Sequence, residues 1–169
     1  MHTHFRRSML ASLILVMATL VIGYAQQPKS DEEMNKRGDH VMGFDHTKTT
    51  HHFSLQQSGG SIEVTANSSD DVESSQQIRM HLKHIAMMFA DGNFNTPMLI
   101  HEQTPPGVPV MQELKGEINY DFEEIDRGAA VRITTKNPNA LKAIHEFLRF
   151  QIKEHKTGDS LVIGKTSPA

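Results

Sequence analysis

The sequence contains neither cysteine nor tryptophan among its 169 residues. Without cysteine, the fold cannot depend on disulfide bonds, and neither a thiolate metal site nor a thiol nucleophile is available. A lipoprotein anchor, which needs a lipidated cysteine, is excluded as well. The stability of the fold must therefore come from burial of apolar side chains.

The chain also lacks the short motifs that mark several common enzyme classes. It has no Gly-x-x-x-x-Gly-Lys-Ser/Thr phosphate loop, no Gly-x-Ser-x-Gly nucleophile turn, no His-Glu-x-x-His zinc helix and no dinucleotide-binding glycine fingerprint. The sequence therefore favours a binding or accessory protein over an enzyme.

No apolar run reaches the length of a membrane span. Arg6 and Arg7 precede an apolar run over residues 9–23, which is about 15 residues long, whereas a spanning helix needs about 20. Small residues follow up to Ala25, so residues 1–25 are predicted to be a signal peptide cleaved after Ala25. An uncleaved anchor is the alternative. Cleavage predicts a periplasmic or secreted protein with no stable membrane insertion.

Positive charge is scarce in the remaining chain. Removal of residues 1–25 leaves 144 residues with 15 Lys and Arg against 20 Asp and Glu, a net charge of about −5. This balance argues against nucleic acid as a partner. Residues 26–40 are polar and charged with no apolar period, so they are predicted to be a flexible tether.

The part of the chain over residues 41–159 predicts a single α+β domain. Apolar residues alternate over residues 49–56, 62–66, 118–122 and 129–134, which predicts two β-hairpins. One long helix is predicted to follow the capping residues 68–71 and to end at about Ala90, and a second runs from Pro138 or Asn139 to His155. A short helix is predicted from Val110 to Lys115. Residues 93–107 are predicted to be a loop, and residues 160–169 a C-terminal tail.

The element order is ββα-(short α)-ββα, which suggests an internal repeat. It predicts a four-stranded antiparallel sheet with two helices on one face. The open sheet face would meet water, a protein partner or a second copy in a homodimer.

The first long helix combines a core face with a flank of metal-ligand residues. Its apolar stripe is predicted to be core and consists of Ile78, Leu82, Ile85 and Phe89. His81, His84 and Met88 occupy the adjoining flank, at spacings that let all three approach one point. Imidazole suits copper and zinc, and thioether sulfur favours Cu(I). Further candidate ligands are His51, Met98 and His101.

Each of these residues also has a structural interpretation. The helix histidines can be boundary residues, and the methionines can fill gaps in the core. Strand parity places His51 on the core face and His52 on the open face. His145 and His155 lie beside or within the apolar stripe of the last helix and are expected to be hydrogen-bonded packing residues. The alternative for His155 is a charge favoured by its place near the helix end.

Three segments carry a resemblance to a known family. Residues 44–53 read FDHTKTTHHF, residues 81–89 read HLKHIAMMF and residues 145–152 read HEFLRFQI. Together they resemble a family of small exported bacterial proteins of unsettled function, and the resemblance covers most of residues 41–159. Some members carry the label aspartate carbamoyltransferase. This chain lacks the Ser-Thr-Arg-Thr and His-Pro-x-Gln elements of such transferases and is too short for their two domains.

Three functions remain as hypotheses. The first is an exported binding or accessory protein with a His/Met metal site for Cu or Zn, copper being favoured. The second is a small-ligand or protein-binding module without metal, with an apolar pocket lined by Phe94, Met98 and the helix. The third is a small enzyme that uses His84 or His101 as a base, which requires a buried histidine paired with a carboxylate in a cleft.

Overall fold

The computed structural model describes residues 31–164 of the chain. The predicted signal peptide, residues 26–30 and the last five residues lie outside this range. Along the chain the elements are α1 (Asp31–Met42), the 3-10 turn η1 (His46–Lys48), β1 (Thr49–Gln56), β2 (Gly59–Ala66), α2 (Val72–Ala90), α3 (Asn95–His101), α4 (Val108–Glu113), the 3-10 turn η2 (Lys115–Glu117), β3 (Ile118–Ile125), β4 (Gly128–Thr135) and α5 (Pro138–Glu154).

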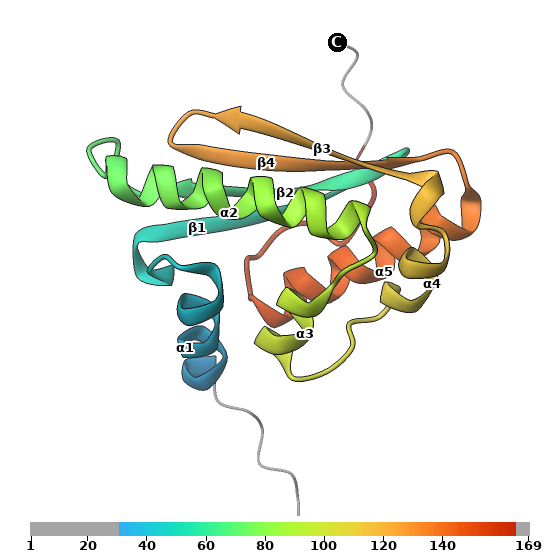
Figure 1. Ribbon diagram of the computed structural model, residues 1–169, viewed down its shortest axis with the longest axis horizontal. Helices are drawn as coiled ribbons and strands as arrows, with labels where there is room; N and C mark the ends of the chain where they lie inside the picture. The colour runs from blue at the N-terminus through green and yellow to red at the C-terminus, as the bar shows by residue number, and fades with distance from the viewer. Residues whose placement is uncertain (1–30, 165–169) are drawn as a thin grey trace, which may run out of the picture.

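The four strands form one antiparallel sheet in the order β1-β2-β4-β3. Helices α2 and α5 both lie against the same face of this sheet (Figure 1). The predicted α+β class and the four-stranded sheet are therefore confirmed. The internal repeat stays a prediction.

Alternation along the strands positions the core. In β1, Phe53 and Leu55 are buried, while the residues between and after them are more exposed. Phe53 pairs with Ile62 of β2, and Ile62 pairs in turn with Val131 of β4, so one row of apolar side chains crosses the sheet. This row faces the two long helices.

The two long helices cover the sheet with the stripes that the sequence predicts. On α2 the four predicted core residues are all buried, and on α5 Ile144, Leu148 and Ile152 are buried. Asp71 starts α2 by accepting a hydrogen bond from the amide of Ser74, and Asn137 starts α5 in the same way. The caps and the apolar stripes thus define both helices from local sequence.

Two segments differ from the sequence prediction. Residues 31–40, predicted as part of the tether, belong to helix α1, and residues 95–101, predicted as loop, form α3. The two helices pack together: the Arg37 Nε donates to the carbonyl oxygen of Ile100 at 3.0 Å, and Met34 is only 9 % exposed. The prediction of a tether is wrong here because this anchoring is tertiary and leaves little apolar period in the sequence.

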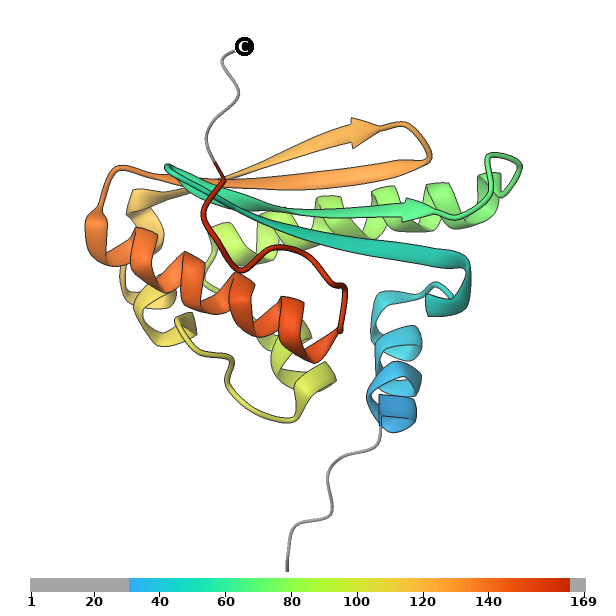
Figure 2. The same cartoon turned by 180° about the vertical axis from the view of Figure 1, so that it is seen from behind.

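The C-terminal segment covers the free edge of β1 (Figure 2). The carboxylate of Asp159 accepts hydrogen bonds from the Phe53 amide and from His52 Nδ1, at 2.8 and 2.9 Å. Gly164 then donates its amide to the carbonyl oxygen of Leu55. The segment therefore satisfies backbone groups that an edge strand otherwise exposes. Over residues 31–164, no helix has the length and apolar character needed to cross a membrane.

Candidate functional site

Three histidines from different elements line one cavity between the sheet and the helices. His51 belongs to β1, His81 to α2, and His155 follows the last residue of α5. The rings of His51 and His155 are nearly parallel, at 11° with centroids 5.6 Å apart. Phe44 packs against both His51 and His81, with centroid distances of 6.0 and 5.5 Å. Strand parity correctly predicts that His51 shares the side of Phe53.

Burial keeps all three imidazoles neutral. Loss of hydration, followed by the smaller effects of neighbouring His52 and His46, lowers the pKa of His51 to about 4. The pKa of His81 is lowered to about 4 by burial and then by His51 and His84, and that of His155 to about 3 by burial and then by His51 and His101. At neutral pH each ring therefore offers one lone pair and one N–H group.

The ring nitrogens of these histidines have no protein partner. Within residues 31–164, no other protein group is hydrogen-bonded to the ring nitrogens of His51, His81 or His155. The three rings face an inner cavity of about 60 Å³, which is otherwise walled by apolar side chains. Gln151 also lines this cavity, is 4 % exposed, and has a buried side-chain nitrogen without a hydrogen-bond acceptor. Buried polar groups normally find partners, so the Gln151 nitrogen, which has none within residues 31–164, marks a place for a bound species beside the three imidazoles.

A second, outer cavity leads toward the surface beneath α1. It has a volume of about 260 Å³ and shares Met42, His51, Ile100 and His155 with the inner cavity. Residues of α1 form one of its walls. Met42, at the end of α1, lines both cavities together with His51 and His155, and its side chain carries a soft thioether donor.

The structure separates the predicted ligands into different places. Of the predicted set, His51 and His81 line the inner cavity. His84 is exposed, since it lies on α2 about 60° further round than His81. Met88 is half-buried with its sulfur 4.0 Å from Thr96 Oγ1, and Met98 lines a shallow pocket at the end of α3. His81, His84 and Met88 thus differ in burial, and their predicted convergence on one point stays a prediction.

His101 is buried beside the cavity without lining it. Its Nε2 lies 3.1 Å from Gln151 Oε1, and its ring packs edge-on against His155 with a centroid distance of 5.1 Å. Its Nδ1 lies 3.9 Å from the carboxylate of Glu154. His101 thus positions Gln151 and His155. Phe94, which the sequence places in a ligand pocket, is instead fully buried and stacked on Phe89.

Sequence reasoning misses two residues of the cavity. His155 follows Ile152 by three residues and so continues the apolar stripe of α5. That spacing was a usable signal, but the alternative of a charged His155 is wrong because burial holds the ring neutral. Met42 had no signal, since it ends a helix that the sequence does not predict.

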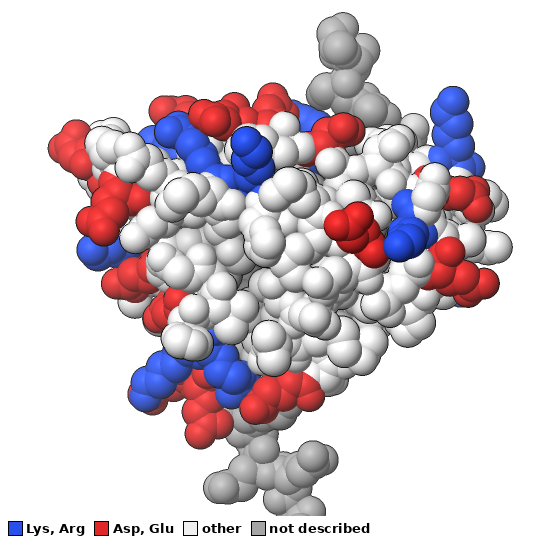
Figure 3. Space-filling model, viewed as in Figure 1, with Lys and Arg blue, Asp and Glu red and all other residues white. Residues whose placement is uncertain are grey.

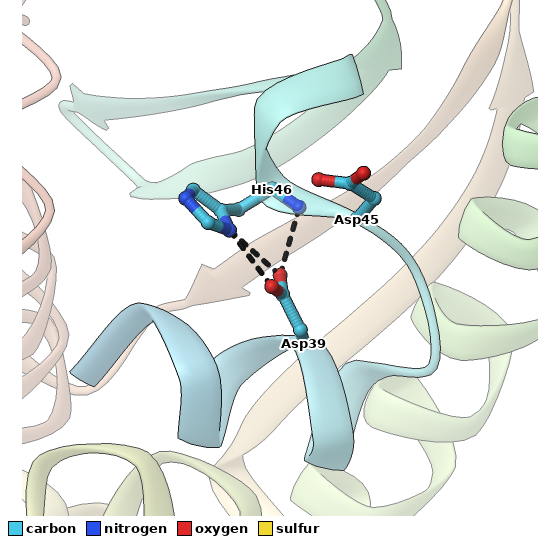
Figure 4. A group of neighbouring side chains, drawn as sticks. All are labelled: Asp39, Asp45 and His46. Carbon is cyan, nitrogen blue, oxygen red and sulfur yellow. Dashed lines mark hydrogen bonds and ion pairs between the residues drawn. The ribbon is translucent and has the colours of Figure 1, made fainter. Parts of the chain in front are cut away.

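A separate group of acidic and imidazole side chains joins α1 to β1 (Figure 4). Asp39 accepts hydrogen bonds from the backbone amide and Nδ1 of His46, at 2.8 and 2.9 Å. Asp45 accepts from the amide and hydroxyl of Thr47. Within residues 31–164, Asp39, Asp45 and His46 are the one group of three or more His, Asp or Glu residues whose ligand atoms all lie within 4.8 Å of one another. These hydrogen bonds stabilise the turn between α1 and β1, so they give the group a structural role. The three cavity histidines do not form a group with ligand atoms this close together.

No protein-family model, curated protein or solved structure matches this chain. The resemblance to small exported bacterial proteins stays a prediction.

Proposed function

We propose that this protein is an exported metal-binding protein whose inner cavity takes one soft transition-metal ion, Cu(I) above others. The observation that carries this proposal is the set of three neutral imidazoles whose ring nitrogens have no protein partner within residues 31–164. Metal binding requires a neutral imidazole, and burial supplies that state without loss of a proton. The volume of about 60 Å³ suits an ion and is well below the roughly 300 Å³ of a small-molecule pocket.

Met42 and the cavity histidines favour copper over zinc. Thioether sulfur is a soft ligand that selects Cu(I), whereas a zinc site uses thiolate, imidazole or carboxylate. The ring nitrogens of the three histidines do not all lie within 4.8 Å of one another. A ligand set of Met42 with two of the imidazoles fits this arrangement, because Cu(I) accepts two or three ligands.

A small polar organic molecule is the second candidate ligand. The outer cavity of about 260 Å³ shares lining residues with the inner one, and the Gln151 nitrogen in the wall of the inner cavity is an unused donor within residues 31–164. A molecule with an acceptor group could bind this nitrogen and lie between the imidazoles. Native mass spectrometry of the purified protein distinguishes the two, because an organic ligand adds its own mass and copper adds its isotope pattern.

The other hypotheses have less support. His101 is held against Gln151 and His155 without lining either cavity, and His84 is exposed, so neither has the pocket that a catalytic base needs. A protein partner or second copy on the open sheet face stays a prediction. That face carries the exposed ion pair of Arg132 with Glu123, at 2.6 Å.

The test is competitive Cu(I) titration of the purified protein and of single variants. His51→Ala and His155→Ala should each raise the Kd of the tight site by about 10–100-fold or more, since loss of even an outer-shell partner costs that much. His40→Ala is the matched control, because His40 is exposed on α1 and lines neither cavity. Unchanged Kd and stoichiometry in both cavity variants would contradict the proposal.

A further inference from the structure

The outward face of α2 carries three soft-ligand side chains that the cavity does not use. Met80 and Met87 are 68 % and 55 % exposed, and His84 is exposed between them. They contrast with Met88 on the same helix, which is half-buried against the core. Exposed methionine is costly in apolar area left in water, so two of them beside an exposed histidine call for an explanation.

Helix geometry brings the three side chains to one place. Met80 precedes His84 by four residues and Met87 follows it by three, the two spacings at which side chains become neighbours at about 5–6 Å between Cβ atoms. Met80 and Met87 lie within about 20° of each other around the helix axis, and His84 within about 60° of both. Two sulfurs and one imidazole nitrogen can therefore reach a common point above the helix surface.

The surroundings of this face offer few of the ligands that hard cations need. Along α2, the side chains one turn before Met80 and beside His84 are Gln76, Gln77 and Lys83, and one carboxylate, that of Asp91, follows Met87 by four residues. Figure 3 shows a broad uncharged area over α2 and α3, with charged side chains around it. Mg²⁺ and Ca²⁺ require oxygen ligands, and a site of two thioethers and one imidazole selects a soft monovalent ion.

We propose that Met80, His84 and Met87 form a second, solvent-exposed site for Cu(I), which Ag(I) also occupies. The site is distinct from the cavity, because His81 lines the inner cavity, whereas Met80, His84 and Met87 are exposed and line neither cavity. Its ligands come from one rigid helix and need no movement of the fold. Exposure makes it the weaker and faster-exchanging of the two sites. It stands on helix geometry and exposure alone, so it does not depend on the cavity proposal.

The experiment is titration of the purified protein with Ag(I), which does not oxidise, followed by NMR of the methionine methyl and histidine ring signals. The Met80 and Met87 methyls and the His84 ring should shift together along one binding curve. The double variant Met80→Leu/Met87→Leu keeps the apolar volume and removes both sulfurs. It should weaken Ag(I) binding at His84 by about tenfold or more. Met98→Leu, on neighbouring α3, is the matched control and should leave the curve unchanged.

The two proposals can fail separately in this titration. If the α2 signals stay fixed while the signals of the cavity histidines shift, the α2 site is overturned and the cavity proposal is supported. If the α2 signals shift in the wild type and equally in His51→Ala, the α2 site stands, whatever the cavity does. Shifts of the His84 ring that persist unchanged in Met80→Leu/Met87→Leu would also overturn the α2 site.

Discussion

The imidazole of His145 lies beneath the β1–β2 turn, with its Nε2 2.9 Å from the carbonyl oxygens of both Gln56 and Gly59. The three cavity histidines, by contrast, have no such partner within residues 31–164. Hydrogen-bond partners therefore separate this structural histidine from the histidines that we propose as ligands. Sequence reasoning correctly expects His145 to be a packing residue, but its partners lie 89 and 86 residues away, where no local pattern can reveal them.

At this scale His145→Ala should lower the free energy of unfolding by about 2–4 kcal/mol, because two carbonyl groups lose their donor and a void opens beneath the turn. Urea denaturation measures the loss. His84→Ala, on the exposed face of α2, is the control and should change stability by less than about 0.5 kcal/mol. An equally small effect of His145→Ala would show that the turn does not depend on this hydrogen bond.

Among the elements, the sequence predicts those whose signals are local. Strand alternation, apolar stripes and caps define β1–β4, α2 and α5, and each of these segments is found where it is predicted. Helix α1 escapes prediction because it is anchored by Arg37 and Met34 against α3 and is otherwise charged. Helix α3, with seven residues, is too short for a helical period to stand out.

The packing of the α4 start against α5 depends on one glycine. Gly107 has a φ of +85°, and a Cβ there would lie 2.1 Å from the carbonyl oxygen of Ala143. Gly107→Ala should therefore destabilise the protein by more than about 1 kcal/mol, through both backbone strain and the clash. Gly116→Ala is the control, since a Cβ at that position meets nothing within 4 Å. Equal unfolding midpoints for the two variants would contradict this account of the contact.

The attachment of α1 predicts local unfolding. Arg37→Ala removes the hydrogen bond to Ile100 and the contact with Glu102. Amide hydrogen exchange in α1 should become faster by about tenfold, while α2 and α5 keep their protection, because helices that rest on few contacts open independently. Lys36→Ala, which removes an exposed pair with Glu32, should leave this exchange unchanged. Uniform change across all helices would show that α1 is part of the cooperative core.

For the whole molecule, the cavity is a product of chain topology. Its walls combine the end of α1, β1, α2 and the end of α5, which are separated by up to about a hundred residues. The sequence identifies two of its histidines, His51 and His81, as candidate ligands, but it does not identify Met42 or His155. Spacing within one helix can predict neighbours along that helix only, whereas the cavity is assembled by sheet pairing and helix packing.

The neutral histidines predict that the metal-free protein loses stability in acid. An unfolded imidazole titrates near pH 6.5, whereas the folded pKa values are about 4 for His51 and His81 and about 3 for His155. Below about pH 6.5 the unfolded state binds more protons, so the free energy of unfolding falls as the pH is lowered toward about 4. The contribution of the three neutral histidines to stability is fully present above about pH 6.5.

Urea denaturation at several pH values after removal of metal with a chelator checks this dependence. Between about pH 4 and 6, His155→Gln should reduce the slope of the free energy of unfolding against pH by the amount that about one bound proton contributes. Identical slopes for wild type and His155→Gln would show that His155 is not held neutral.

Copper K-edge X-ray absorption of the Met80→Leu/Met87→Leu protein, loaded with one equivalent of Cu(I), tests the central claim most directly. In this background the α2 sulfurs are absent, so any sulfur bound to copper must come from elsewhere. The cavity predicts mixed imidazole and thioether ligation, and Met42→Leu should remove the sulfur while the imidazoles remain. Sulfur ligation that survives Met42→Leu, or copper that stays bound unchanged when His51 and His155 are replaced, would contradict a metal site in this cavity.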